Sequence, residues 1–369
     1  MPPHTPLPPF AATHGPRDAP VVLVGEAWGE QEEKGRRPFL GSSGTELARM
    51  LTQAGLGPSL PPREWLTRDD LWDYWRRSGF LVTNVLAARP PANDILTWCT
   101  TKKELPHDYT MPPLSQGKYL RPEYLPELQR LHTELAAYPR TLILALGSTA
   151  LWACLGTAAI SSNRGVVHPS PWGKILPTFH PSAVLRQWSL RPIVLADFLK
   201  ALRESDFPEI RRPSRSILIS PTLTEAQTWA QEAASAPAIA CDIETANKQI
   251  TCVGFSRSNL MAMVVPFYDG RHLDGAYWPS LDSEIAAWRI VKGLLEGPQV
   301  KVFQNGLYDL QYLTRMGIQP RNCTSDTMLL HHALYPELQK GLGFLASLYA
   351  DEGAWKLMRK HTEELKRDE

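Results

Sequence analysis

The sequence predicts an α/β protein with two domains. Its 369 residues exceed what one ordinary hydrophobic core holds, so a second domain is expected. The first half alternates short runs rich in Val, Ile and Leu with helical stretches, which is typical of buried parallel strands in an open sheet. Residues 204–216, "ESDFPEIRRPSRS", are polar and contain proline, and a new series of strand-like runs follows them.

Composition and charge limit the class of protein. The hydrophobic fraction of 43% and the charged fraction of 21% are those of a globular chain rather than a disordered one. No apolar run approaches the roughly 20 residues of a membrane span, and the N-terminus lacks a secretory signal, so we expect a cytoplasmic protein that contacts no membrane. The five cysteines form no C-x-x-C pair, which favours free thiols over disulfides. A net charge of +1 gives no indication of nucleic-acid binding.

Four apolar runs of the first half end in small or polar residues. These runs are "APVVLVGEA", "FLVTNVLAA", "TLILALGS" and "KILPTFHPS", and each is interpreted as a strand. In an open α/β sheet the ligand site lies beyond the carboxyl ends of the strands. We therefore expect one cleft lined by the four strand ends, which are Gly25-Glu26-Ala27, Thr83-Asn84, Gly147-Ser148 and His180-Pro181-Ser182.

The tripeptide His-Pro-Ser occurs twice, at His168 and at His180. His180 directly follows the run "KILPTF", and Pro181 suits the first turn of the helix "SAVLRQWSL". His168 precedes the turn "PWGK", on the far side of an expected hairpin. The sequence therefore predicts that His180 faces the cleft. The alternative for either histidine is a loop residue held by backbone hydrogen bonds.

The second half begins with three strand-like runs, of which "QITCVGFSRS" and "MAMVVPFYD" are expected to form a hairpin. A helix at "SEIAAWRIVKGLLEG", a strand at "VKVFQN" and two further helices complete a pattern typical of an α+β or α/β layer domain. In "ACDIETA" the period of two places Asp242 and Glu244 on one face of a strand. In "FQNGLYDLQYL" Asn305 and Asp309 are four residues apart, on one side of the expected helix.

The motifs of the first half together resemble the uracil-DNA glycosylase superfamily, nearest to its family 4. They are "VVLVGEAWGEQEEKGRRPFLGSSGTELARML", "LVTNVLAARPPAND", "LILALGSTALWACLG" and "RGVVHPSPWGKILPTFHPSAVLR", in the family's order over about residues 18–203. Enzymes of this kind extrude a nucleotide from the base stack and cleave the bond between sugar and base. The resemblance implies DNA as a partner, either single-stranded or as a primer-template.

The resemblance implies a role for each of four cleft residues. Phe39 would stack on the base, and Asn84 would read the base edge. His180 would donate a hydrogen bond to the base oxygen as negative charge grows, and Glu26 would position water. From the residues alone other interpretations stay open. Phe39 also suits a core position, Asn84 a turn cap and Glu26 a solvated loop.

The same resemblance implies roles for further residues. At some positions, however, this sequence departs from the family's pattern. Ser182 and Arg186 would lie near the DNA backbone, and Ala27 beside the base. Trp28 stands in "GEAWG" where the family has proline, so it would narrow the pocket, stack on bases or close the pocket. The family's iron-sulfur cluster is held by four cysteines, but "NVLAARPP" has alanines after the asparagine and no N-terminal cysteine pair exists. No iron-sulfur cluster is therefore expected.

The acidic motifs of the second half resemble the 3′-5′ exonuclease domain of family A DNA polymerases, an RNase H-like fold. The likeness covers about residues 215–360 and rests on the Asp242-x-Glu244 and Asn305-x-x-x-Asp309 motifs. Such domains hydrolyse phosphodiesters with two divalent metal ions. The resemblance implies Asp242, Glu244 and Asp309 as ligands of Mg²⁺ or Mn²⁺, with Asn305 in support. The alternative is a solvated pair of acids, and we expect Asp326 to be a helix N-cap.

The third exonuclease motif, Tyr-x-x-x-Asp, does not occur after residue 326. The exonuclease site is therefore expected to be completed by a separate polymerase chain, or to be inactive. The domains expected are a Pro-rich arm at 1–17, a glycosylase-like parallel-sheet domain at 18–205, a linker at 206–216 and a truncated, mixed-sheet exonuclease-like domain at 217–369.

The sequence thus predicts the N-terminal part of a phage- or bacterial-type family A replication polymerase, which acts in the host cytoplasm if phage-encoded. In this interpretation it combines base excision with metal-dependent proofreading. The alternative is a non-catalytic module that binds DNA and docks onto a polymerase.

Overall fold

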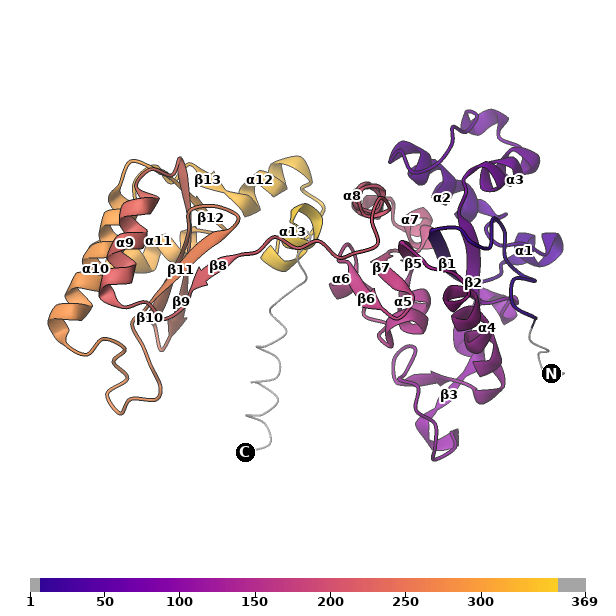
Figure 1. The fold of residues 1–369 in the computed structure, drawn as a ribbon, viewed down its shortest axis with the longest axis horizontal. Helices are drawn as coiled ribbons and strands as arrows, with labels where there is room; N and C mark the ends of the chain where they lie inside the picture. Colours follow the sequence, from indigo (N-terminus) through magenta and orange to yellow (C-terminus); the bar gives the residue numbers. More distant parts are fainter. Residues whose placement is uncertain (1–6, 351–369) are drawn as a thin grey trace. The chain divides into compact units, whose positions relative to one another are not determined.

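The computed structural model describes residues 7–350. These residues form two compact units, the first made of residues 7–210 and 343–350 and the second of residues 211–342 (Figure 1). Residues 1–6 of the expected arm and residues 351–369 lie outside the described residues. The C-terminal part of the expected exonuclease-like domain therefore lies outside the described residues.

The first unit is built on a five-stranded sheet in the order β2-β1-β5-β7-β6. Strands β1, β2, β5 and β7 are parallel, and β6 forms the expected hairpin with β7. A separate ribbon pairs β3 with β4. The strands are β1 (Val21–Ala27), β2 (Leu81–Leu86), β3 (Cys99–Thr101), β4 (Lys118–Leu120), β5 (Leu142–Leu146), β6 (His168–Ser170) and β7 (Gly173–Thr178). The α-helices are α1 (Glu30–Gly35), α2 (Ser42–Gln53), α3 (Arg68–Arg77), α4 (Leu125–Ala136), α5 (Ser148–Leu155), α6 (Ile160–Asn163), α7 (Pro181–Arg186), α8 (Arg191–Glu204) and α13 (Leu342–Tyr349).

Helices cover both faces of this sheet, because successive side chains of its strands point to opposite faces. Leu23 and Leu144 pack with α2, α3, α7 and α8. Val22 and Ile143 pack with α4 and α5 on the other face. Apolar side chains thus fill both sides of the strands, and the polar residues of the motifs are left at the carboxyl edge of the sheet.

The N-terminal segment 7–17 packs against the outer edge of the sheet. His14 and Val82 of β2 exchange two backbone hydrogen bonds of 2.9 and 2.8 Å. The His14 ring stacks on Trp72 with centroids 4.2 Å apart, and the Arg37 guanidinium lies 3.7 Å from the Trp72 ring centroid. The expected Pro-rich arm is therefore an ordered cover for β2 over its described residues.

The second unit contains a six-stranded mixed sheet in the order β13-β12-β9-β10-β11-β8. Strands β10 and β11 form the expected antiparallel hairpin, β9 is antiparallel to β10, and β12 is parallel to β9. Its strands are β8 (Ser216–Leu218), β9 (Ala238–Ala246), β10 (Gln249–Ser256), β11 (Met261–Pro266), β12 (Val300–Phe303) and β13 (Ser325–Asp326). Its helices are α9 (Leu223–Ala233), α10 (Leu281–Glu296), α11 (Leu307–Arg315) and α12 (Thr327–Leu334).

The described chain returns to the first unit at α13. Arg164 Nη1 donates to Ser347 Oγ at 3.0 Å, and Lys200 Nζ donates to the Ser347 carbonyl at 2.5 Å. Arg164 also forms a two-point ion pair with Asp197 of α8, and Thr178 Oγ1 of β7 donates to the same carboxylate at 2.7 Å. This fully buried cluster ties β7, α8 and α13 together.

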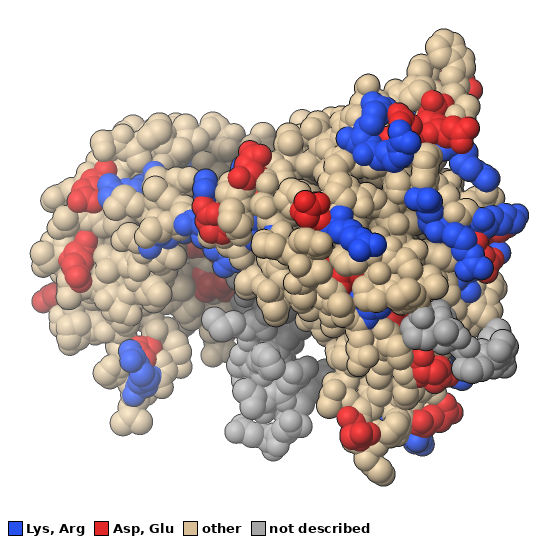
Figure 2. Space-filling model, turned by 45° about the vertical axis from the view of Figure 1, so that its right-hand side comes forward, with Lys and Arg blue, Asp and Glu red and all other residues tan. Residues whose placement is uncertain are grey.

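The predicted fold class is confirmed, with a parallel-rich sheet in the first unit and a mixed sheet in the second. Between the end of α8 at Glu204 and the start of β8 at Ser216 lies a stretch without helix or strand, which overlaps the expected linker. No helix within residues 7–350 is long and apolar enough to span a bilayer. On the face shown in Figure 2, basic and acidic side chains are interspersed.

Candidate functional site

A cavity of about 630 Å³ lies at the carboxyl ends of the parallel strands of the first unit. All four predicted strand ends contribute to its wall, and so does the start of α7. His168 lies in β6 and does not line the cavity, whereas His180 does. The predicted residues that line it are Glu26, Ala27, Trp28, Phe39, Asn84, His180, Ser182 and Arg186.

Phe39 and Asn84 converge above Gly25 of β1. A Cβ atom at Gly25 would collide with Asn84 Oδ1 and would lie 2.6 Å from Phe39 Cζ, so only glycine fits there. Asn84 is 3% exposed and lies within β2, so it is not a turn cap. Phe39 contributes to the hydrophobic core and to the cavity wall.

Phe39 is held in a left-handed backbone conformation, with φ of 56°. Its carbonyl accepts a hydrogen bond of 3.1 Å from Trp75 Nε1. Gly44 passes so close to that carbonyl that any Cβ would collide with it. A non-glycine residue rarely adopts this conformation without compensating contacts, and the surrounding contacts here fix the ring at the cavity.

His180 is the N-cap of α7, whose first residue is Pro181, as predicted. The Ser182 backbone N–H donates to His180 Nδ1 at 3.2 Å, so in the neutral ring the proton is on Nε2. Burial, together with the charge of Arg186, lowers the pKa of His180 to about 4. The Phe39 and His180 rings are stacked with centroids 6.3 Å apart, and a Cβ at Gly147 would lie 2.9 Å from His180 Cβ. His180 is therefore a neutral N–H donor in the cavity wall near pH 7.

Glu26 is the penultimate residue of β1 and is half-buried, so it is not a solvated loop charge. Its Oε2 accepts a hydrogen bond of 2.5 Å from Thr149 Oγ1 of α5. Burial raises its pKa, while the Thr149 hydrogen bond and the charge of Arg186 act in the opposite direction. Sequence reasoning missed Thr149, although "GSTAL" places it directly after a strand end.

Trp28 is 3% exposed and packs with Ala12 and Ala87, on the side of the cavity next to the N-terminal segment. Its backbone N–H donates to the Ala88 carbonyl at 3.0 Å. The side chain is thus a fixed part of the wall, and the cavity remains open beside it. Of the three interpretations of Trp28, closure of the pocket is wrong.

Glu32 is a wall residue that sequence reasoning missed. Its carboxylate accepts hydrogen bonds from the backbone of Gly29 at 3.1 Å and of Gly41 at 2.8 Å. These two bonds link the segment after β1 to the start of α2, with Phe39 between them. A buried acid in the run "EQEEK" gives no local sequence signal, because any of its glutamates would suit a solvated helix.

The first unit does not have the donor set for an iron-sulfur cluster. Four thiolates hold such a cluster. Only Cys99 and Cys154 belong to the first 210 residues, and both are buried. Ala87 and Ala88 occupy the loop after Asn84, and the Ala87 N–H donates to Glu127 Oε2 at 3.0 Å. The residues present therefore do not fit this group.

In the second unit, β9 alternates buried and exposed side chains, so Asp242 and Glu244 share the exposed face as predicted. Asp309 of α11 is buried, and its Oδ1 accepts a hydrogen bond of 2.9 Å from the Ile243 backbone N–H. That bond places Asp309 beside the segment between the two other acids. Burial, and further the charges of Asp242 and Asp326, raise the pKa of Asp309 to about 6.

Asn305 does not lie on the helix with Asp309, which corrects the prediction. Helix α11 begins at Leu307, and Asn305 precedes it with φ of 59°, a left-handed conformation that asparagine tolerates. Its backbone N–H donates to Asp326 at 3.2 Å. Asp326 also caps α12 by accepting from Met328 and Leu329, as predicted.

Oxygen donors of this kind suit Mg²⁺ or Mn²⁺. Within residues 7–350, however, no three side chains of His, Cys, Asp or Glu lie close enough together to hold a metal ion. The described acids therefore supply the right chemistry without a preassembled site. Tyr308, which sequence reasoning missed, hydrogen bonds to Thr245 Oγ1 at 2.6 Å beside these acids.

Comparisons with known proteins match these two units. Residues 12–204 match the model of the uracil DNA glycosylase superfamily, and residues 218–364 match the 3′-5′ exonuclease model. The type-4 uracil-DNA glycosylase of Thermotoga maritima is 31% identical over 192 residues, which cover 51% of this chain and 78% of that protein. The type-4 uracil-DNA glycosylase of Archaeoglobus fulgidus is 30% identical over 190 residues, which cover 50% of this chain and 77% of that protein.

Among solved structures, the catalytic core of RRP6 from Trypanosoma brucei has a TM-score of 0.32 and 14% sequence identity, covering 41% of this chain and 39% of that one. The chain thus spans less than half the length of that neighbour. The glycosylase superfamily match covers more than half of this chain. The chain therefore belongs to the uracil DNA glycosylase superfamily, and a segment of the 3′-5′ exonuclease family is fused behind its glycosylase domain.

Proposed function

We propose that the first unit excises uracil from DNA. The observation that carries this proposal is the convergence of Phe39, Asn84, His180 and Glu26 on one cavity at the carboxyl ends of the strands. Its volume of about 630 Å³ falls in the range of small-molecule sites, so it has room for one extruded base. A flat ring, an amide, a neutral donor and a shielded carboxylate are the groups that this reaction needs.

Each of these groups has a distinct task in the proposed reaction. Phe39 stacks on the extruded base, and Asn84 hydrogen bonds to the base edge. His180 Nε2–H stabilises the uracil anion as the bond between sugar and base breaks, without having to give up a proton. Glu26 orients the attacking water or supports the cationic sugar. Ser182 and Arg186 at the start and end of α7 hold the DNA backbone.

A single assay tests this proposal. The full chain is incubated with 5′-labelled single-stranded DNA that contains one uracil, with and without Mg²⁺, and then treated with alkali. Alkali-dependent cleavage at the uracil, independent of Mg²⁺, is the expected result. DNA binding without cleavage would instead support the alternative of a non-catalytic DNA-binding and polymerase-docking module.

For the second unit we propose 3′-end trimming that depends on Mg²⁺ or Mn²⁺, with Asp242, Glu244 and Asp309 as ligands. The proposed setting is replication by a family A polymerase of phage or bacterial type, in the cytoplasm, with a separate polymerase chain supplying the third exonuclease motif. A Mg²⁺-dependent ladder in the same assay, produced or strengthened when such a polymerase chain is added, supports this setting. No ladder under either condition contradicts it.

Asp309→Asn is expected to stabilise the second unit above pH 6 in the absence of divalent ions. The pKa of Asp309 is about 6 in the folded protein, compared with 3.8 for an aspartate exposed to water, as in the unfolded chain. The folded state therefore holds a proton that the unfolded state has released, and stability falls as pH rises from about 4 to about 6. Asparagine carries no charge and keeps an oxygen for the Ile243 N–H. Calorimetry at pH 8 should show a higher Tm for the variant.

Addition of Mn²⁺ should reverse the order of the two Tm values, so that the wild type becomes more stable than Asp309→Asn. An ion that binds only the folded state adds about 2.7 kcal/mol to the free energy of unfolding when its free concentration is 100 times its Kd. The wild-type Tm should therefore rise with Mn²⁺, and the Tm of Asp309→Asn should not. The matched control is Asp282→Asn, an exposed acid in the first turn of α10, which should respond to Mn²⁺ like the wild type. An equal Mn²⁺ response of Asp309→Asn would remove Asp309 from the ligand set.

A further inference from the structure

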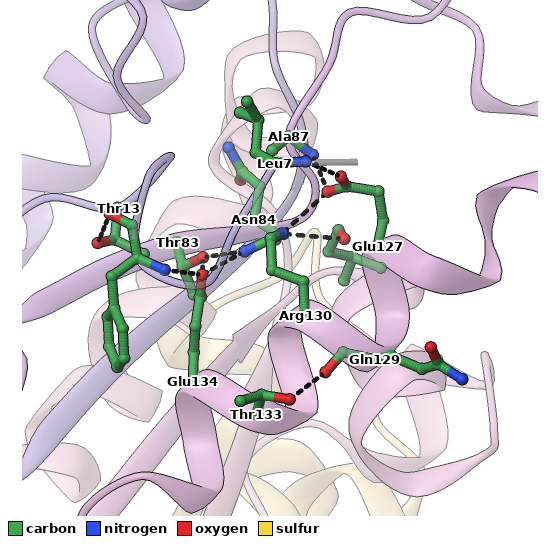
Figure 3. A network of polar contacts seen from close by, with 12 residues as sticks. Leu7, Thr13, Thr83, Asn84, Ala87, Glu127, Gln129, Arg130, Thr133 and Glu134 are labelled. Carbon is green, nitrogen blue, oxygen red and sulfur yellow. Dashed lines mark hydrogen bonds and ion pairs between the residues drawn. The ribbon is translucent and has the colours of Figure 1, made fainter. Parts of the chain in front are cut away.

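A buried ion network lies beneath the loop that follows Asn84 (Figure 3). Arg130 lies on α4, one turn from both Glu127 and Glu134, and all three side chains are at most 4% exposed. Arg130 Nε donates to Glu127 Oε2 at 2.9 Å, and Nη1 donates to Glu134 Oε1 at 2.6 Å. The remaining nitrogen, Nη2, donates to the carbonyl of Asn84 at 2.6 Å and to that of Val85 at 3.2 Å.

The two carboxylates extend the network in two directions. Towards β2, Glu127 accepts from the Ala87 N–H at 3.0 Å, and Glu134 accepts from Thr83 Oγ1 at 2.8 Å. Towards the N-terminal segment, Glu127 accepts from the Leu7 N–H at 3.1 Å and Glu134 from the Phe10 N–H at 2.9 Å. Each carboxylate therefore joins the N-terminal segment to the end of β2.

Such a network is costly to bury, and its contacts indicate what it does. Two carboxylates and one guanidinium lose their water here, and well-packed apolar side chains often give equal or greater stability in such positions. An apolar side chain, however, cannot bind a backbone carbonyl in one fixed place. The network's five polar contacts with β2 and the residue that follows it all fall within residues 83–87, the segment that contains Asn84. The network is therefore placed to fix this segment and not merely to fill the core.

We propose that Arg130 is a positioning residue for Asn84, and that Glu127 and Glu134 make this positioning depend on the N-terminal segment. The proposal rests on the proposed excision of uracil, in which Asn84 reads the base edge. The Asn84 side chain packs directly against the Gly25 backbone, because Asn84 Oδ1 occupies the space that a Cβ atom at Gly25 would need. A shift of the Asn84 backbone of about 1 Å would thus misplace the amide, and misplacement on this scale costs about 100-fold in rate.

The test compares Arg130→Met with Arg140→Met in the full chain. Arg140 is a matched control because it is also buried and donates only to backbone carbonyls, those of Ala19, Glu134 and Leu135. None of these three residues lines the cavity. Hydrogen exchange measured by mass spectrometry should be faster in Arg130→Met within both 7–14 and 83–88. Arg140→Met should leave 83–88 as in the wild type.

Excision kinetics supply the second readout. For Arg130→Met we expect kcat/KM on uracil-containing DNA to fall by about 100-fold, while the affinity for the same DNA without uracil stays unchanged, since Arg130 and its two carboxylate partners do not line the cavity. Arg130→Lys keeps the charge without the two-pronged geometry and should recover only part of the loss. Should Arg130→Met fail to fold, Leu7→Pro is the milder variant, because it keeps all three charged side chains of the network. It removes the N–H that Glu127 accepts and the leucine side chain that packs beside Trp28.

The two proposals fail in different ways. A wild-type chain that leaves uracil in place overturns the proposed excision, and the exchange comparison still tests the network. Unchanged exchange in 83–88 for both Arg130→Met and Leu7→Pro overturns the positioning role. So does unchanged excision by Arg130→Met in a chain whose wild type is active.

Discussion

Replacing His180 with alanine is expected to slow uracil excision by about 100- to 1,000-fold, the loss that follows removal of one donor from a developing anion. The expected loss is this large because His180 is half-buried in the cavity wall and supplies a neutral N–H. Its Nδ1 is occupied by the Ser182 N–H, so the imidazole presents Nε2–H to the base. Single-turnover assays on uracil-containing DNA measure the rate constant of the cleavage step.

The matched control is His168→Ala, which changes the other copy of His-Pro-Ser. His168 lies in β6, outside the cavity, so excision by this variant should remain within about twofold of the wild type. His180→Asn addresses the loss of the helix cap, because asparagine is itself a good N-cap but cannot reach as far into the cavity. If His180→Asn folds and excises uracil at the wild-type rate, His180 is not the donor.

The pH dependence of excision should reflect the lowered pKa of His180. With a pKa of about 4, His180 stays neutral from pH 5 to 8, so it should cause no change in kcat across that range. The unfolded chain takes up a proton on this histidine near pH 6.5, whereas the folded chain does so only near pH 4. His180 therefore lowers the stability of the first unit as pH falls from about 6.5 to about 4.

Asp197→Ala is expected to lower the free energy of unfolding of the first unit by about 3–5 kcal/mol, the usual cost of removing one partner of a buried ion pair. Asp197 is fully buried, and its carboxylate neutralises Arg164 and accepts from Thr178 Oγ1. Without it, Arg164 stays buried with its charge uncompensated. Urea unfolding of the full chain, followed by tryptophan fluorescence, measures the change.

Asp73→Ala is the control for that experiment, since Asp73 forms ion pairs with Arg76 and Arg77 on the surface of α3. The Asp73 side chain is 45% exposed, and pairs of this kind contribute at most about 1 kcal/mol. Similar costs for Asp197→Ala and Asp73→Ala would show that the cluster around Arg164 is held by other contacts. Asp197→Asn should fall between the two, because it keeps an acceptor for Thr178 while losing the charge.

Much of the fold was predictable because it depends on local patterns. Buried parallel strands give continuous apolar runs. The rule that their carboxyl ends share one edge predicts that Glu26, Asn84 and His180 line the same cavity, as they do. The same rule separated His180 from His168, since only one of them follows a parallel strand.

The contacts that fix the cavity were not predictable in this way. Glu127 and Arg130 lie in an ordinary amphipathic helix, and their partners Leu7 and Asn84 are 120 and 46 residues away in the sequence. Gly25 and Phe39 likewise depend on a close approach between separate elements. Asn305 was placed on a helix because the spacing of four fits one, but the turn after β12 takes a left-handed residue before α11 begins. The periodicity of apolar residues shows which face of a single helix or strand is buried. It does not show which separate elements contact each other.

The return of the chain to the first unit at α13 has a consequence for protein synthesis. The ribosome makes residues 211–342 after the first unit's sheet is complete and before Ser347 exists. At ordinary translation rates this interval is on the order of 10 s, far longer than most small domains need to fold. Arg164 and Lys200 must spend that time without the Ser347 groups they later bind, so the nascent glycosylase domain reaches its final packing only after the nuclease segment has left the ribosome.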